Sequence, residues 1–354
     1  MDCVFLMNIF KLSIALIALV TLTSCSGLGL LYKAFAITSI ATSSESGLTV
    51  VYALRNRNMP GATVGKTRAL PGVMKYDSTG AVVSSFGVNG LVMLEMGSSD
   101  FHAWGTRIRV APGGNAIWVV GAKGVDKENS SIFAAKITPS GTVEGIFEFD
   151  VPTDGTGFDV GYDFAFTDPT SPSSNIIIAG AGDYKVAALK IDSAGQLVTA
   201  FGDAGFVLQS FGVNAFASSM VMQADGKFTL VAVAGNNASS KTYILSHNAD
   251  GSPNTSFGVN GQVTLALGPT FDYSPEIAIQ GDSFVIGLTV EYYPDVPMMG
   301  FPNDNSYFGI AKVGMNGVLV SDVGGNGVVY VNPSSKNDIM YDMWASDDAI
   351  YVAG

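Results

Sequence analysis

One pattern recurs along this 354-residue chain and limits its possible folds more than any other feature: a glycine turn followed by Phe-Gly-x-x-Gly. The clearest copies read YDSTGAVVSSFGVNG (76–90), IDSAGQLVTAFGDAG (191–205) and NADGSPNTSFGVNG (248–261). Fainter copies, TPSGTVEGIFEF and GMNGVLVSDVGGNG, start at Thr138 and Gly314. The phenylalanine position recurs every 54 to 66 residues, at Phe86, Phe147, Phe201, Phe257 and, in a degenerate copy, Val323. Such a period indicates repeated supersecondary units.

Each unit predicts four β-strands and no helix. In the second unit the expected strands are Leu91–Met96, Gly105–Ala111, Ala116–Gly121 and Ser131–Thr138. Tight turns such as Ala224-Asp225-Gly226-Lys227 separate strands, because glycine adopts positive φ without steric cost. The 42 glycines and the low charged fraction of 14% agree with many short strands. We therefore expect an all-β protein, a β-propeller of four-stranded blades, with a β-sandwich array or a solenoid as the alternative.

The strand pattern predicts about five complete blades and a partial sixth, and an incomplete ring. About 22 strands can be read, whereas a closed six-bladed ring needs about 24. The sequence stops after an apolar strand that reads DDAIYVAG. Either residues 26–33 help to close the last blade, or the chain is truncated in the last repeat, which we expect. An open ring would expose unpaired strand edges.

The N-terminus resembles a bacterial lipoprotein signal peptide. Ile9–Leu22 is nearly all apolar, with Lys11 as an early positive charge, a length that suits a signal core better than a membrane span. The run ends in Leu22-Thr23-Ser24-Cys25, which resembles a lipobox, so Cys25 is the expected site of lipidation. A plain signal peptide or an apolar helix is the alternative. Because Asp2 and Cys3 do not suit the start of a signal, Met7 is an alternative start.

These features divide the chain into a signal peptide (1–24), a lipidated tether (25–33) and a propeller (34–354). By resemblance to Gram-negative lipoproteins, Ser26 after the cysteine favours the outer membrane, on either its periplasmic or its surface side. Several acyl chains, palmitate included, would anchor the protein firmly. Cys3 would leave with the signal and Cys25 would carry lipid, so no thiol would remain for a disulfide.

The repeated turn, followed by an Asp-Gly-Lys hairpin and an apolar strand that ends in Ala-Gly, resembles the bacterial delta-60 repeat. The resemblance covers about residues 34–354 and is most specific at Asp250-Gly251 with Phe257-Gly258, and at Phe86-Gly87. It implies an extracytoplasmic propeller. It supplies no catalytic residues that could be carried over to this chain.

The long connections are expected on the face opposite the repeated turns, because alternate connections of an up-and-down sheet lie at opposite ends. They are Leu54–Leu70, Ala122–Ser130 and Val290–Ser306. Loops on a rigid scaffold often carry binding residues. The aromatic and methionine content of the third loop suggests a contact surface made of Tyr292, Tyr293, Met298, Met299 and Phe301. The alternative is an insertion that packs on its own blade.

Candidate catalytic and metal sites are sparse. The two histidines, His102 and His247, fall on different repeats, and no GxSxG, CxxC or HExxH motif occurs. The stretch Asp154–Asp159 (DGTGFD) resembles half of a calcium-binding turn, although an ordinary glycine turn explains it as well. We find no series of acids or histidines at equivalent strand positions, so we expect no catalytic residue, cofactor or metal.

The net charge of −12 argues against nucleic-acid binding, which needs a basic surface. The leading hypothesis is a non-enzymatic envelope lipoprotein, attached to the membrane by its N-terminal lipid, whose propeller binds a protein or a polysaccharide. The alternatives are a hydrolase, lyase or sugar dehydrogenase with a site in the central channel, and a purely structural envelope protein. Three or more acids, histidines or asparagines that converge in the channel would favour the enzyme.

Overall fold

The computed structural model describes ten stretches of the chain: residues 34–43, 47–56, 68–97, 102–126, 129–153, 157–235, 240–265, 275–291, 306–333 and 338–354. These stretches form 22 strands and one short 3-10 turn, η1 (Pro112–Gly114). Within them, no helix combines the length and the hydropathy needed to cross a bilayer. The predicted signal peptide and Cys25 lie outside the described residues.

The strands form five four-stranded sheets and one two-stranded sheet, all antiparallel and in sequence order. The first two sheets contain β1 (Ala34–Ser43), β2 (Gly47–Asn56), β3 (Arg68–Lys75) and β4 (Leu91–Met93), then β5 (His102–Val110), β6 (Ile117–Asp126), β7 (Asn129–Ile137) and β8 (Val143–Phe149). The third and fourth contain β9 (Val160–Phe166), β10 (Ile176–Gly182), β11 (Lys185–Ile191) and β12 (Phe206–Gln209), then β13 (Ala215–Met222), β14 (Phe228–Ala234), β15 (Lys241–His247) and β16 (Gln262–Leu265). The last two contain β17 (Glu276–Gln280), β18 (Ser283–Glu291), β19 (Ser306–Gly314) and β20 (Val328–Val331), then β21 (Asp342–Ala345) and β22 (Ile350–Ala353).

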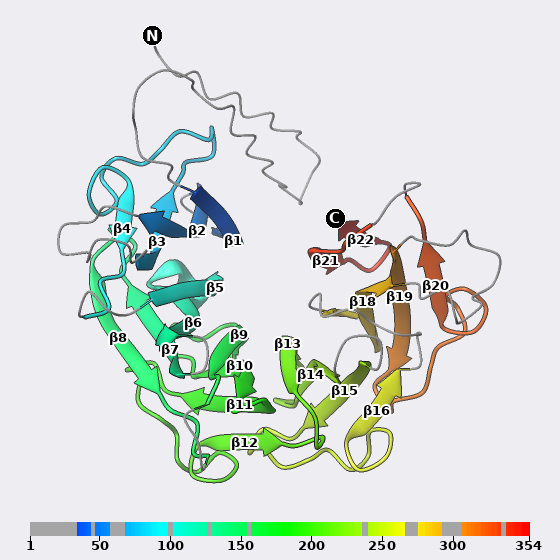
Figure 1. The fold of residues 1–354 in the computed structure, drawn as a ribbon. Helices are drawn as coiled ribbons and strands as arrows, with labels where there is room; N and C mark the ends of the chain where they lie inside the picture. The colour runs from blue at the N-terminus through cyan, green and yellow to red at the C-terminus, as the bar shows by residue number, and fades with distance from the viewer. Residues whose placement is uncertain are drawn as a thin grey trace.

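The sheets follow one another around a common centre as the blades of a propeller (Figure 1). The first strand of each blade lies innermost and the fourth strand lies at the periphery. The predicted architecture, five complete blades and a partial sixth, is therefore confirmed. Because neighbouring strands are antiparallel, the repeated turns lie at one end of the blades, and the strand ends that flank the long connections lie at the other.

The blades are out of phase with the sequence repeat by one strand. We expected Leu91–Met96 to open the second unit, but β4 pairs with β3 and completes the first blade. Each Phe-Gly-x-x-Gly turn thus leads into the outermost strand of its own blade, and the chain then crosses to the next one. The repeated turn therefore lies between the third and fourth strands of one blade, and the blade boundary comes one strand later.

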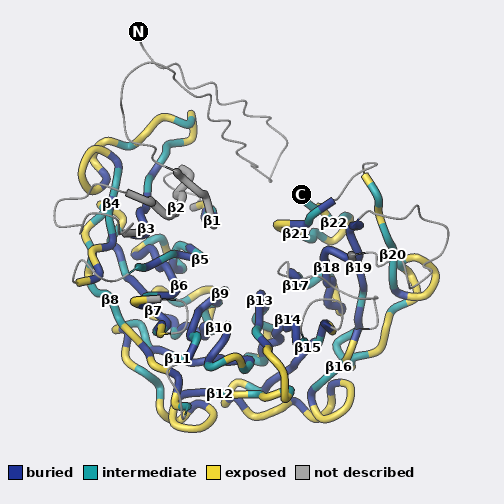
Figure 2. Tube along the Cα trace, viewed as in Figure 1, coloured by how far each residue is buried: buried dark blue, intermediate teal, exposed yellow. Residues whose placement is uncertain are grey.

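The hydrophobic core lies mainly between blades. Buried residues concentrate in the strands, whereas the outer turns are exposed (Figure 2). Phe201 of the third blade packs against Phe228 of the fourth, with ring centroids 5.8 Å apart. Phe257 of the fourth blade meets Phe284 of the fifth edge-on at 5.9 Å. Both repeat phenylalanines are almost completely buried. The repeated aromatic residue therefore holds each blade to the blade that follows.

A backbone hydrogen bond accompanies each of these contacts. The amide of the Phe-Gly glycine donates to a carbonyl in the glycine turn of the next blade: Gly87 to Ser140 at 3.0 Å, Gly202 to Asp250 at 2.7 Å and Gly258 to Asn316 at 3.0 Å. We call this bond the inter-blade latch. It brings two turns together at each of three blade junctions, which explains why both turns repeat.

A lysine on the third strand strengthens the same junctions. The ammonium groups donate to the carbonyl one residue before the latch acceptor: Lys75 to Pro139 at 3.2 Å and Lys190 to Ala249 at 3.5 Å. Lys190 also lies 5.7 Å from the centre of the Phe201 ring, within cation–π range. One side chain thus contacts both the aromatic core and the neighbouring turn.

The copy around Phe147 has a different structure. The chain enters β8 directly after the turn at 138–142, without a Phe-Gly-x-x-Gly turn. Phe147 is half-buried, and its ring lies 6.1 Å from Trp118 and covers Gly195, where an added Cβ would lie 2.4 Å from ring atoms. An aromatic side chain therefore occupies the position that a backbone latch fills elsewhere.

The latch predicts a large effect for Gly251→Ala. Gly251 has a φ of +91°, and an added Cβ would lie 3.0 Å from the Gly202 amide nitrogen and 2.8 Å from Val207. Left-handed strain alone costs about 1–2 kcal/mol, and we expect about 1 kcal/mol more from the weakened latch hydrogen bond. The control is Gly212→Ala. Gly212 also has a positive φ, of +71°, but an added Cβ there would meet no other atom within 4 Å. Urea unfolding measures the stability of both variants. An equal loss of stability in the two would contradict the role of the latch.

Candidate functional site

The innermost strands of all six sheets place one polar residue at the same register position. This position pairs with Val51, Val120, Ala179, Val231, Gly287 and Ala353 of the adjacent strands. The six residues, which we call the polar ring, are Ser39, Arg107, Asp163, Ser219, Glu276 and Asp342. In four sheets a register shift directly precedes the ring residue, as between Gly105 and Arg107. β-bulges of this kind re-aim side chains and are common beside functional sites.

Arg107 connects blades that are not neighbours. Its Nη2 lies 3.0 Å from Glu276 Oε1 of the fifth blade, and its Nε lies 3.0 Å from Asp163 Oδ1 of the third. A side chain of the second blade can reach the fifth only across the centre of the propeller. The guanidinium of Arg107 therefore lies in the central channel.

Asp163 is the most completely bonded member of the ring. Its Oδ1 lies 2.8 Å from Arg109 Nη2, and its Oδ2 accepts from the Met220 amide at 2.9 Å and from Ser219 Oγ at 3.3 Å. Burial opposes the charged form, but the two guanidinium groups outweigh it and hold the pKa of Asp163 below its usual range. This carboxylate is ionised and has no capacity left for a ligand.

Glu276 and Asp342 differ from Asp163. Glu276 is buried, and burial raises its pKa even though Arg107 opposes the shift. Asp342 is exposed, and its Oδ1 accepts from the Met343 amide at 2.9 Å. Asp342 is also close enough to Arg107 and Glu276 to act on both electrostatically. These two carboxylates are the part of the ring that can still receive a donor.

The polar ring corrects one sequence interpretation. We expected no series of acids at equivalent strand positions, yet Asp163, Glu276 and Asp342 form one, at steps of 56 to 66 residues when Ser219 is included. The series is hard to see because Arg, Ser, Asp and Glu alternate, so no single residue type repeats. A strand alignment that allowed for the bulges would have found it.

The predicted interaction residues Tyr292, Tyr293, Met298, Met299 and Phe301 lie outside the described residues. So do Cys25 and Asp154. Of the proposed half calcium turn the structure describes Asp159, whose Oδ2 and Oδ1 accept from the amides of Val151 at 2.8 Å and Asp183 at 3.0 Å. In the part of the chain that is described, no three His, Cys, Asp or Glu side chains are grouped as metal ligands. Asp159 therefore fixes backbone segments.

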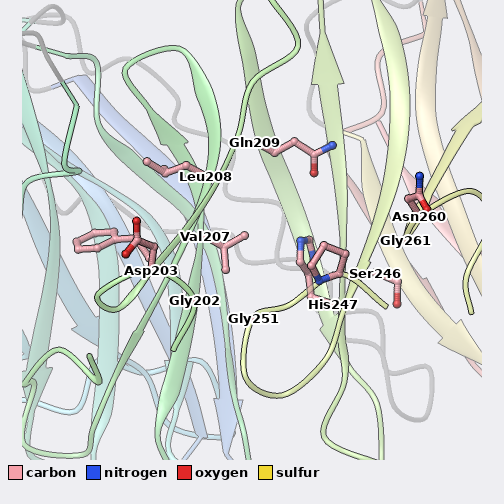
Figure 3. Close-up of a pocket in the computed structure, with 12 residues that line it drawn as sticks. Gly202, Asp203, Val207, Leu208, Gln209, Ser246, His247, Gly251, Asn260 and Gly261 are labelled. Atoms are coloured by element: carbon pink, nitrogen blue, oxygen red, sulfur yellow. The ribbon is translucent and has the colours of Figure 1, made fainter. Parts of the chain in front are cut away.

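A groove of about 400 Å³ lies at the junction of the third and fourth blades, on the side of the repeated turns (Figure 3). Val207, Leu208 and Gln209 of β12 line one wall, and Ser246 and His247 of β15 line the other. His247 is buried and stacks on Phe228 at 5.0 Å. Burial lowers its pKa to about 4, so it is neutral at pH 7. His247 therefore belongs to the inter-blade core.

The pKa of His247 predicts a loss of stability in weak acid. The folded value of about 4 lies below the unfolded value of about 6.5, so the protein favours the neutral ring. The neutral His247 ring thus contributes about 3 kcal/mol to the free energy of unfolding. This contribution is complete above pH 6.5 and is lost as the pH falls towards 4. Urea unfolding of His247→Ile between pH 7 and pH 4 should show a correspondingly weaker pH dependence than the wild type, because Ile137 and Ile191 fill this position in other blades. Parallel curves would contradict the assignment.

No protein-family model matches this chain, and no curated protein matches it in sequence. Among solved structures, hydrazine synthase from Kuenenia stuttgartiensis is similar at a TM-score of 0.56 and 13% identity, over 93% of this chain and 77% of that one. The periplasmic gluconolactonase PpgL from Pseudomonas aeruginosa is similar at a TM-score of 0.41 and 14% identity, over 83% of this chain and 71% of that one. The first similarity concerns the fold alone and agrees with a β-propeller; the second is too low to carry an argument.

Proposed function

We propose that this β-propeller is a lipid-anchored binding protein of the cell envelope, which holds a group of its protein or polysaccharide ligand at the polar ring without transforming it. The observation that supports the proposal is the ring itself. Six blades present polar residues at one register, and Arg107 lies across the channel between them. Asp342 and Glu276 keep acceptor capacity beside that arginine.

The charges of the site favour a ligand group that is cationic and donates hydrogen bonds. The three ring carboxylates (Asp163, Glu276, Asp342) face two guanidinium groups, that of Arg107 in the ring and that of the neighbouring Arg109. The ring together with Arg109 therefore carries one excess negative charge when all are ionised. Asp163 is already saturated. A primary ammonium between Asp342 and Glu276 would balance the excess charge, because charge-assisted hydrogen bonds are the strong ones.

Calorimetric titration with 1,4-diaminobutane tests this binding site, with 1,4-butanediol as a neutral ligand of equal length. At low ionic strength we expect the diamine to bind and the diol not to bind. Asp342→Asn should weaken diamine binding about tenfold, which corresponds to about 1.4 kcal/mol. The control is Asp347→Asn, an exposed aspartate of the turn between β21 and β22. Equal binding of diamine and diol, or an unchanged affinity in Asp342→Asn, would refute the site.

The membrane anchor is tested separately. Cells that express the chain are labelled with radioactive palmitate, and we expect label on the wild type and none on Cys25→Ala. Cys3→Ala is the matched control, since this cysteine precedes the expected cleavage site. Label that persists on Cys25→Ala would exclude the lipoprotein assignment and leave the binding site unaffected.

A second candidate function is an enzyme that uses the same channel, as a hydrolase, lyase or sugar dehydrogenase. Two observations favour it. Asp163, Glu276 and Asp342 converge around Arg107 in the channel, as expected of the enzyme, and Glu276 is a buried carboxyl group whose raised pKa suits general acid–base catalysis. A panel of chromogenic p-nitrophenyl esters and glycosides tests the hydrolase form. Turnover by the wild type that is lost in Glu276→Gln would favour the enzyme over the binding protein.

A further inference from the structure

Aromatic side chains gather at one mouth of the central channel, on the face of the blades opposite the repeated turns. Phe158 lies just before the innermost strand β9, and Tyr184 lies in the turn between β10 and β11. Their rings stack with centroids 5.9 Å apart and 19° between the ring planes. Tyr184 is 40% exposed and Phe158 is half-buried. The pair therefore offers a flat aromatic surface at this mouth.

The turn that presents Tyr184 is strained. Asp183 and Tyr184 follow one another with φ of +48° and +60°, values that glycine adopts freely and a bulky side chain rarely does. Hydrogen bonds hold the turn in place, since the Asp183 amide donates to Asp159 at 3.0 Å and the Tyr184 carbonyl accepts from the Ala215 amide at 2.8 Å. Backbone strain of this kind clusters at ligand sites. An exposed aromatic residue in a strained turn thus points to a role in binding.

A second aromatic pair lies between this mouth and the polar ring. Tyr162 and Phe216 belong to β9 and β13, the innermost strands of neighbouring blades (Figure 1), and their half-buried rings lie 5.3 Å apart. Tyr162 directly precedes Asp163 of the polar ring. From Phe158 to Asp163 an extended chain covers on the order of 15 Å. An oligomer can therefore reach from the aromatic mouth to the ring, whereas a single sugar cannot.

The two kinds of contact favour different parts of one ligand. The electron-rich faces of aromatic rings attract the C–H face of a pyranose, and the carboxylates of Glu276 and Asp342 accept charge-assisted hydrogen bonds from an ammonium group. Aromatic walls with a few placed polar groups are typical of ligand sites. Each unit of an amino sugar chain carries both features. A lysine-rich peptide lacks the C–H face, and a neutral polysaccharide lacks the charge.

We propose that the ligand of the polar ring is a chain of amino sugars with free amino groups, which stacks on Phe158 and Tyr184 at the channel mouth and places one ammonium group between Glu276 and Asp342. This inference rests on the proposed binding site at the ring and narrows its ligand to one class. The net charge of −12 favours the approach of a polycation. Tyr184 is then a specificity-determining residue, which selects a sugar over a peptide of the same charge.

The test compares matched oligomers by calorimetric titration of the full chain at low ionic strength. The probes are the β-1,4-linked tetramer of glucosamine, the neutral tetramer of N-acetylglucosamine, and N-acetylated tetralysine amide, which has as many amines as the first. We expect the glucosamine tetramer to bind at least tenfold more tightly than the other two and than glucosamine itself. Saturation-transfer NMR should show the strongest transfer to C–H protons of the sugar rings. Equal or tighter binding of the peptide or of the neutral tetramer would overturn the proposal.

Tyr184→Gly completes the test, because glycine adopts a φ of +60° without strain and the turn can keep its shape. We expect at least tenfold weaker binding of the glucosamine tetramer and an unchanged affinity for 1,4-diaminobutane, with urea unfolding to verify the fold. The control is Tyr184→Phe, which keeps the ring and should bind the tetramer as the wild type does. An unchanged tetramer affinity in Tyr184→Gly would overturn the proposal. If the diamine binds and the tetramer binds no better, this inference fails and the ring site stands; if neither binds, both fail.

Discussion

Asp163→Ala should lower the free energy of unfolding by about 3–5 kcal/mol, because it removes a buried carboxylate and leaves two half-buried guanidinium groups without their shared partner. Arg107 and Arg109 both pair with Asp163, and the Met220 amide and Ser219 hydroxyl donate to it as well. The variant removes all of these interactions at the centre of the propeller. Urea unfolding followed by tryptophan fluorescence provides the measurement.

The matched control is Asp203→Ala. Asp203 lies in a Phe-Gly-x-x-Gly turn and is exposed, so its removal should change stability by no more than about 0.5 kcal/mol. A double variant, Asp163→Leu with Arg107→Met, should recover part of the loss, since well-packed apolar groups can replace a buried ion pair. If Asp163→Ala is no less stable than Asp203→Ala, the ring is not a structural ion network.

Phe257→Ala should cost about 3–5 kcal/mol, the usual range for a buried phenylalanine. Its side chain is completely buried and meets Phe284 edge-on at 5.9 Å, so truncation opens a cavity at the junction of the fourth and fifth blades. Phe147→Ala is the comparison, because it holds the same place in the sequence repeat but is half-buried. We expect Phe147→Ala to lower the free energy of unfolding clearly less than Phe257→Ala does. Equal losses would mean that the two residues play the same structural part, against the geometry described above.

The repeat made the fold predictable because each blade needs the same two turns. Phe86, Phe201 and Phe257 recur at the same place in each repeat, and the structure shows that all three are buried in the core shared with the following blade. The grouping of strands into blades was not predictable from the pattern, since a repeat has no defined start. Pairing of β4 with β3 is decided by backbone hydrogen bonds rather than by composition.

The polar ring could not be found from residue types alone. Arg107, Ser219 and Glu276 occupy one register position, but they share neither charge nor shape. Their equivalence depends on the bulges before Arg107 and Ser219, which shift the register by one residue and have no counterpart before Glu276. The contact between Arg107 and Glu276 depends on how the blades curve around the common centre, which no local pattern encodes.

The bond between Arg107 and Glu276 has a consequence for how the chain folds. The two residues are 169 positions apart in sequence, so forming this contact in an unfolded chain would cost on the order of 4–5 kcal/mol of loop-closure entropy. Contacts between successive blades span about a third of that sequence length, so forming them costs less loop-closure entropy. Arg107 should therefore contact Glu276 last, after the intervening blades have assembled. This contact can form only when the array of blades has the correct curvature.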